Sequence, residues 1–164
     1  MYEKSIERLN QAVADELSAV HQYMYFHFHC DDQGLDLLAR LFFQTALEEM
    51  RHIETIAERI LFLKGEVELK ASEEVQKIHD PVEMLKLSVK MEQGSIKDYN
   101  LWANECSANA DSASRKLFEA LVDDEERHYG QWDNELENLE KYGQSYLALQ
   151  AIERGRGGGS GPQP

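Results

Sequence analysis

The tetrapeptide Glu-Met-Arg-His at residues 49–52 has a counterpart 76 residues later, Glu-Glu-Arg-His at residues 125–128. Each is a Glu-x-x-His step inside a stretch whose apolar residues recur at spacings of three and four, the pattern of an amphipathic helix. Residues three apart share one helix face, so each step directs a carboxylate and an imidazole at the same place. The two steps therefore predict two helices that present matching polar pairs to one interior.

Two more glutamates, Glu16 and Glu92, lie on the apolar faces of the other predicted helices and are separated by the same 76 residues. The step from Glu16 to Glu49 is 33 residues, as is the step from Glu92 to Glu125. The same offset of 76 relates four further pairs: Tyr23 and Tyr99, Phe42 and Phe118, Arg51 and Arg127, and Cys30 and Cys106. The chain therefore consists of two copies of one predicted helical hairpin. An internal pseudo-twofold axis would relate them and would set two similar groups of polar side chains side by side.

Four long helices are predicted, roughly at residues 3–32, 35–63, 81–108 and 112–143. Gly34 and Gly65 close the first two, and Asp80-Pro81 is a typical helix start. The sixteen residues 65–80 are long enough to cross the length of a bundle. A short periodic piece from 146 to 152 predicts a fifth helix. The expected fold is all-α, a four-helix bundle with a long crossover between helices 2 and 3.

One domain is expected over residues 1–153, followed by a flexible Gly- and Pro-rich tail at 154–164. The formal net charge of −14 argues against a nucleic-acid partner, because phosphate binding needs clustered Lys and Arg. No apolar run approaches the ~20 residues that cross a bilayer, so no membrane contact is expected. Residues 1–7 are charged from the start and lack the apolar region of a signal peptide, which predicts a cytoplasmic protein.

The two cysteines form no Cys-x-x-Cys motif and are expected to be reduced thiols. In a crossover bundle the first and third helices run antiparallel. At ~1.5 Å per residue, Cys30 and Cys106 would then lie roughly 40 Å apart, which excludes an intramolecular disulfide.

Four ionised carboxylates cannot stay unpaired in a dry core, since each would cost several kcal/mol. Two divalent metal ions would balance their charge. An oxygen-rich ligand set with one imidazole per metal suits iron or manganese better than structural zinc. The predicted ligands are Glu16, Glu49, His52, Glu92, Glu125 and His128. A bundle with buried polar networks and no metal is the alternative, which the matching offsets disfavour.

At these residues the chain resembles the ferritin superfamily, and bacterioferritins most closely, over about residues 3–153. The resemblance rests on residues 15–23, on 48–52 followed by 57–63, and on 124–128. It implies a ferritin-like fold with a short fifth C-terminal helix. The roles that it implies are bridging of two irons by Glu49 and Glu125, terminal ligation by Glu16 and Glu92, and capping of one iron each by His52 and His128.

The resemblance also implies an activity and partners. The expected reaction is oxidation of paired Fe(II) by O2 or peroxide, followed by deposition of ferric mineral inside a hollow shell of 24 subunits. A ferredoxin-type protein would be the reductant. Tyr23 would lie near the metals and supply an electron; the alternative is a core aromatic with a bonded hydroxyl.

Met50 corresponds to the family's haem residue. It lies about 100° around the helix from Glu49 and so faces out of the bundle. Two copies across a dimer twofold would bind haem b, or a related iron porphyrin, through their thioethers. A methionine that packs a dimer interface is the alternative.

The chain departs from the family pattern at a few positions. Gln44 and Glu48 stand where well-studied bacterioferritins often have His and Asp, so an inner-surface iron site is expected to be altered or missing. The family's tryptophan three residues after the second metal histidine is Gln131 here, with Trp132 one place on. The route of electrons from the metal site to the mineral is therefore expected to differ.

Other di-metal enzymes on the same bundle remain alternatives: a rubrerythrin-like peroxidase or a manganese catalase. Rubrerythrins add a glutamate where this chain has Ser95, and usually a four-cysteine domain that it lacks. Classical non-haem ferritins usually lack the histidine present here as His128, and miniferritins build their sites between subunits. A haem-binding shell protein whose bundle site is idle is the non-enzymatic alternative.

Overall fold

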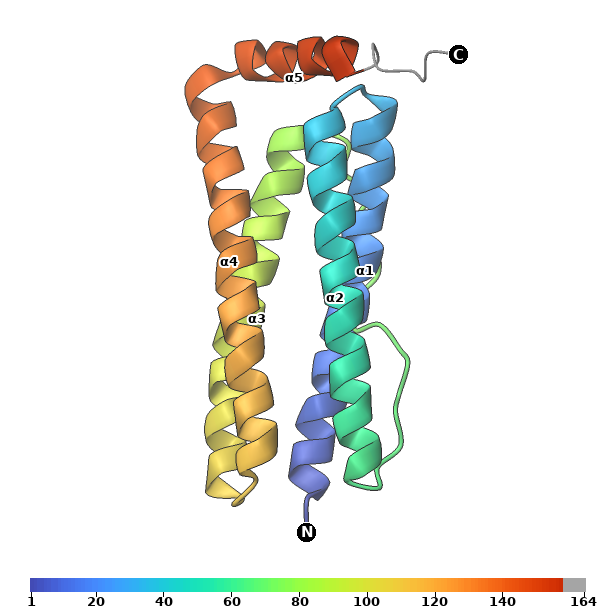
Figure 1. Cartoon of the computed structure of the whole chain (residues 1–164), viewed down its shortest axis with the longest axis vertical. Helices are drawn as coiled ribbons and strands as arrows, with labels where there is room; N and C mark the ends of the chain where they lie inside the picture. Colours follow the sequence, from blue (N-terminus) through green and yellow to red (C-terminus); the bar gives the residue numbers. More distant parts are fainter. Residues whose placement is uncertain (158–164) are drawn as a thin grey trace, which may run out of the picture.

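The computed structural model describes residues 1–157, and all regular secondary structure in that range is α-helical. Its five helices are α1 (Glu3–Asp32), α2 (Asp36–Phe62), α3 (Pro81–Ala108), α4 (Ser112–Tyr142) and α5 (Gln144–Gly157). The first four lie side by side as a bundle, and α5 lies across one end of it (Figure 1). The predicted all-α bundle with a short fifth helix is confirmed. Residues 158–164 of the predicted tail lie outside the described residues, and the boundary at residue 153 stays a prediction.

The bundle consists of two antiparallel hairpins, α1 with α2 and α3 with α4 (Figure 1). The connection from α2 to α3 runs along the outside of the bundle, so α3 runs antiparallel to α1, as predicted. Side-chain amides of α1 hold this crossover in place. Gln22 accepts from the backbone N–H of Gln76 at 2.8 Å and donates to its carbonyl at 3.0 Å. Asn10 makes the same pair of bonds with the backbone of Glu66 and Glu68.

The helix ends follow the local chemistry of the sequence. The Asp80 carboxylate accepts from the Glu83 N–H at 3.0 Å, which confirms Asp80 as the N-cap of α3. Gly34 takes the left-handed φ of 77° expected after α1. After α2 the left-handed residue is Lys64, not Gly65. A Cβ on Gly65 would lie 2.8 Å from Ile6, so the glycine allows the chain to pass close to α1.

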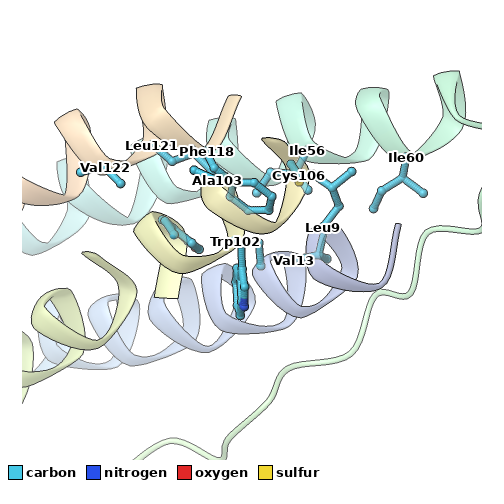
Figure 2. Close-up of a cluster of buried hydrophobic side chains, with 12 residues drawn as sticks. Leu9, Val13, Ile56, Ile60, Trp102, Ala103, Cys106, Phe118, Leu121 and Val122 are labelled. Carbon is cyan, nitrogen blue, oxygen red and sulfur yellow. The ribbon is translucent and has the colours of Figure 1, made fainter. Parts of the chain in front are cut away.

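The apolar core forms two clusters, one toward each end of the bundle. Figure 2 shows the first, in which side chains from all four long helices point at one another, among them Leu9, Ile56, Trp102 and Phe118. The second cluster is built around large aromatic rings: Tyr23, Phe26, Phe42 and Trp132. The polar residues of the predicted metal site lie on the same helices between the two.

Cys106 belongs to the first cluster and Cys30 to the second, and both are free thiols. This confirms that no intramolecular disulfide joins them. Burial raises the pKa of Cys30 to about 12, so this thiol stays protonated. Among residues 1–157 no helix combines the length and apolarity needed to cross a membrane.

Candidate metal centre

Six ionisable side chains from the four long helices meet in the middle of the bundle. His52 is 7% exposed, and the other five are at most 2% exposed. They form two groups whose potential ligand atoms all lie within 4.8 Å of one another: Glu16, Glu49, His52 and Glu125, and Glu49, Glu92, Glu125 and His128. The structure therefore brings all six predicted ligands together, with Glu49 and Glu125 common to both groups.

Both imidazoles direct Nδ1 at the carboxylates. Nδ1 of His52 lies 2.8 Å from Glu49, 3.3 Å from Glu125 and 3.4 Å from Glu16. Nδ1 of His128 lies 3.1 Å from Glu49 and 3.3 Å from Glu125. The geometry can thus hold two cations side by side, each facing one imidazole and three carboxylates.

The pKa values reflect this crowding of charge. Burial, together with the charges of Glu16 and other carboxylates, raises the pKa of Glu49 to about 8 and that of Glu125 to about 7. Burial alone lowers the pKa of His128, but its bonds to Glu125 and Glu49 outweigh burial and raise the pKa to about 12. A divalent cation must displace such protons, so its affinity should increase with pH.

Two tyrosines fix the terminal glutamates. The Tyr23 hydroxyl donates to Oε1 of Glu92, and the Tyr99 hydroxyl donates to Oε1 of Glu16 at 2.6 Å. Each tyrosine thus reaches across the pseudo-twofold axis to the other hairpin. Tyr23 lies at the centre as expected. Tyr99 was not predicted as a site residue, although its offset of 76 from Tyr23 was the signal that could have identified it.

Trp132 makes the two halves unequal. Its Nε1–H donates to Oε1 of Glu92 at 3.3 Å, and its ring stacks on Phe42 at 4.6 Å. The position related to Trp132 by the offset is Ile56, which has no polar atom. The neighbouring Gln131 bonds Thr45 at 3.0 Å and links α4 to α2. Among the four buried glutamates, only Glu92 therefore accepts from both a phenol and an indole.

The outer nitrogen of each imidazole also meets a carboxylate. Nε2 of His52 lies 2.9 Å from Oδ2 of Asp124, and Nε2 of His128 lies 2.9 Å from Oε2 of Glu48. Neither acid was predicted as part of the site. They too are 76 residues apart, so the repeat contained the signal.

A cavity of about 260 Å³ between α1, α3 and the crossover reaches the centre from outside. Glu16, Glu49 and Glu92 line its inner part. Asp15, Asp98, Glu73, Glu74 and Lys90 also contribute to its lining. The charged residues of the wall are thus acidic except for Lys90, which favours cations over anions.

Met50 points away from this centre, as predicted. It is 54% exposed, whereas the adjacent Glu49 is buried. Leu47 and Phe43, one and two turns earlier on α2, are also partly exposed. Met50 therefore belongs to an apolar row on the outer surface of α2.

Comparison with known proteins gives a consistent result. The Ferritin family model, a ferritin-like domain, matches residues 6–142. Bacterioferritins of Desulfovibrio desulfuricans and Rhodobacter capsulatus are each 33% identical, over 88% and 89% of this chain and over 81% and 91% of their own lengths. The X-ray structure of the Desulfovibrio desulfuricans bacterioferritin, which describes its diiron site, matches with a TM-score of 0.90 at 33% identity over 91% of this chain and 87% of that one. The chain belongs to the ferritin-like family and, within it, to the bacterioferritins.

Proposed function

We propose that this protein stores iron and oxidises Fe(II) at the centre of its bundle. The observation that carries the proposal is the pair of four-residue groups that share Glu49 and Glu125. In this proposal those two glutamates bridge two iron ions. Glu16 and His52 complete one site, and Glu92 and His128 complete the other. The bacterioferritin with the similar fold has a diiron site, which supports two irons at this centre.

Two Fe(II) ions are the substrate, and each gives up one electron. With O2 as the oxidant, two electrons and two protons yield H2O2; with H2O2, they yield two water molecules. Four carboxylates in a dry site favour the more highly charged Fe(III) product over Fe(II). Tyr23, held against Glu92, is proposed as an additional electron donor, and the acidic cavity as a path along which Fe(II) reaches the glutamates.

Anaerobic Fe(II) titration followed by exposure to O2 or H2O2 tests this function. We expect a rapid oxidation phase that saturates near two irons per subunit, followed by slower mineral growth. The two oxidants are compared by the rate of the rapid phase. Slow oxidation without saturation would contradict the ferroxidase function and favour a haem-binding or structural role.

The remaining parts of the proposal concern assembly. We propose a hollow shell of 24 subunits in the cytoplasm, with a ferredoxin-type reductant that releases the iron. Large apolar side chains exposed on the single chain support burial against other copies. They include Phe28, Leu61, Phe62 and Leu149. Particle mass in the titrated sample checks the subunit number.

Haem binding at a dimer twofold is proposed through Met50. The exposed thioether and its apolar neighbours Phe43 and Leu47 are compatible with an iron porphyrin, which would supply a redox-active group there. Replacing Met50 by leucine keeps the apolar volume and removes the sulfur. We expect this variant to lose the haem absorption band while it keeps its rate of Fe(II) oxidation. A haem band of unchanged position and intensity would show that Met50 only packs the interface.

A further inference from the structure

The imidazoles of the centre are held from both sides. Nδ1 of His52 and of His128 faces the buried glutamates, and Nε2 of each faces an acid nearer the surface, Asp124 or Glu48, at 2.9 Å. A carboxylate can only accept, so Nε2 must carry the proton in both rings. Nδ1 can then keep its lone pair for a metal ion.

The two acids act across the bundle. Glu48 on α2 directly precedes the shared Glu49 but contacts the histidine of α4. Asp124 on α4 directly precedes the shared Glu125 but contacts the histidine of α2. Each helix of the α2–α4 pair thus orients the metal ligand of the other, in agreement with the pseudo-twofold axis.

Arg127 joins the two acids on the outside. Its guanidinium pairs with the Glu48 carboxylate and lies 3.5 Å from Oδ1 of Asp124. This holds the acceptor oxygens of both acids near their imidazoles. Arg51, at the related position on α2, is exposed as well, and among the described residues its side chain bonds neither acid, so Arg127 alone spans the two.

We propose that Glu48, Asp124 and Arg127 form a clamp that positions the two histidines for metal binding. This inference rests on the proposed di-metal function and assigns it three further residues. Acids that accept from the second nitrogen of a metal-bound histidine typically contribute about 10–100-fold to metal affinity. Because Glu48 and Asp124 are 30% and 45% exposed, the fold itself should not depend on them.

Equilibrium titration with Co(II) tests the clamp without any oxidation step. The unmodified protein should bind two ions per subunit. Glu48→Ala should weaken one of the two sites about 10–100-fold, and Asp124→Ala the other. The visible spectrum of bound Co(II) should change in each variant because the imidazole is no longer held. Arg127→Ala should weaken both sites, each by less than the loss of its acid does.

Conservative and matched variants separate positioning from a general effect of charge. Glu48→Gln keeps an acceptor oxygen and should restore most of the affinity that Glu48→Ala loses. Glu126→Ala removes an exposed carboxylate from α4 nearby and should leave both sites unchanged. Melting of the metal-free variants should be close to that of the unmodified protein.

Three outcomes decide the inference. If the unmodified protein binds two Co(II) ions and both alanine variants bind them equally well, the clamp is wrong while the proposed function stands. If Glu126→Ala weakens Co(II) binding as much as the other two alanine variants do, the clamp is also wrong, because the effect is then one of overall charge. If the unmodified protein binds fewer than two ions, the di-metal function fails and the clamp with it. Glu48 and Asp124 are tested separately, so failure of one variant to fold leaves the other decisive.

Discussion

Replacement of Glu49 by alanine is expected to abolish the rapid oxidation of Fe(II). Glu49 belongs to both four-residue groups, so its loss removes a ligand from each metal position at once. Loss of an outer partner of a ligand alone typically costs 10–100-fold, so loss of a shared ligand should lower the rate by more than about 100-fold. Stopped-flow measurement after anaerobic loading, at two irons per subunit, gives this rate directly.

The fold of the Glu49 variant should survive. Burial and the charges of Glu16 and Glu92 raise the pKa of Glu49 to about 8, so its ionised form is disfavoured in the metal-free protein even though both imidazoles contact it. Glu49→Ala removes these repulsive contacts, and Glu125 remains in contact with both imidazoles, so neither histidine is left without a buried carboxylate. Glu54→Ala, on an exposed position of the same helix, is the matched control and should oxidise Fe(II) normally. A rapid phase that persists in Glu49→Ala would place the oxidation elsewhere in the protein.

Replacement of Trp132 by alanine should give the largest loss of stability, about 3–5 kcal/mol of the free energy of unfolding. Its side chain is fully buried and contacts the rings of Tyr23 and Phe42. Truncation leaves a large cavity and also takes one donor from the buried Glu92. Urea denaturation of the metal-free protein measures the effect.

Two further variants show how much of that loss comes from ring packing and how much any aromatic residue of the helix would cause. Trp132→Phe keeps most of the ring packing and loses only the Nε1–H, so it should cost clearly less than alanine. Tyr142→Ala removes an exposed aromatic ring at the end of the same helix and should change stability by no more than about 0.5 kcal/mol. A loss below about 1 kcal/mol for Trp132→Ala would mean that the second apolar cluster repacks around the gap.

Much of the fold was predictable because the local signals agree. Apolar spacing, the Asp80-Pro81 start and Gly34 each mark a helix or its end by chemistry within a few residues. The six buried polar residues were predictable for a different reason. Burial of acids and histidines in a core costs free energy, so their repetition at an offset of 76 indicates that they form one shared site.

Contacts between side chains of different helices were harder to predict from the sequence. Trp132 lies one position away from the family's usual tryptophan, and from the sequence this shift predicts only a different electron route. In the structure it packs on Phe42 and donates to Glu92. The contacts that a single residue makes depend on how the neighbouring helices pack, as well as on the apolar periodicity of its own helix.

The sequence by itself determined the four long helices, the long crossover, the repeat and the six candidate ligands. Helical periodicity is visible within the sequence of a single helix. The positions of the costly buried charges can be compared between the two repeats by counting residues. Only the tertiary structure decided that Tyr23 reaches Glu92 while Tyr99 reaches Glu16, and that Glu48 and Asp124 each hold the histidine of the opposite helix. These pairings depend on the rotation and axial position of helices packed side by side, to within the 2.5–3 Å of a hydrogen bond. Spacing along the chain does not specify distances on that scale.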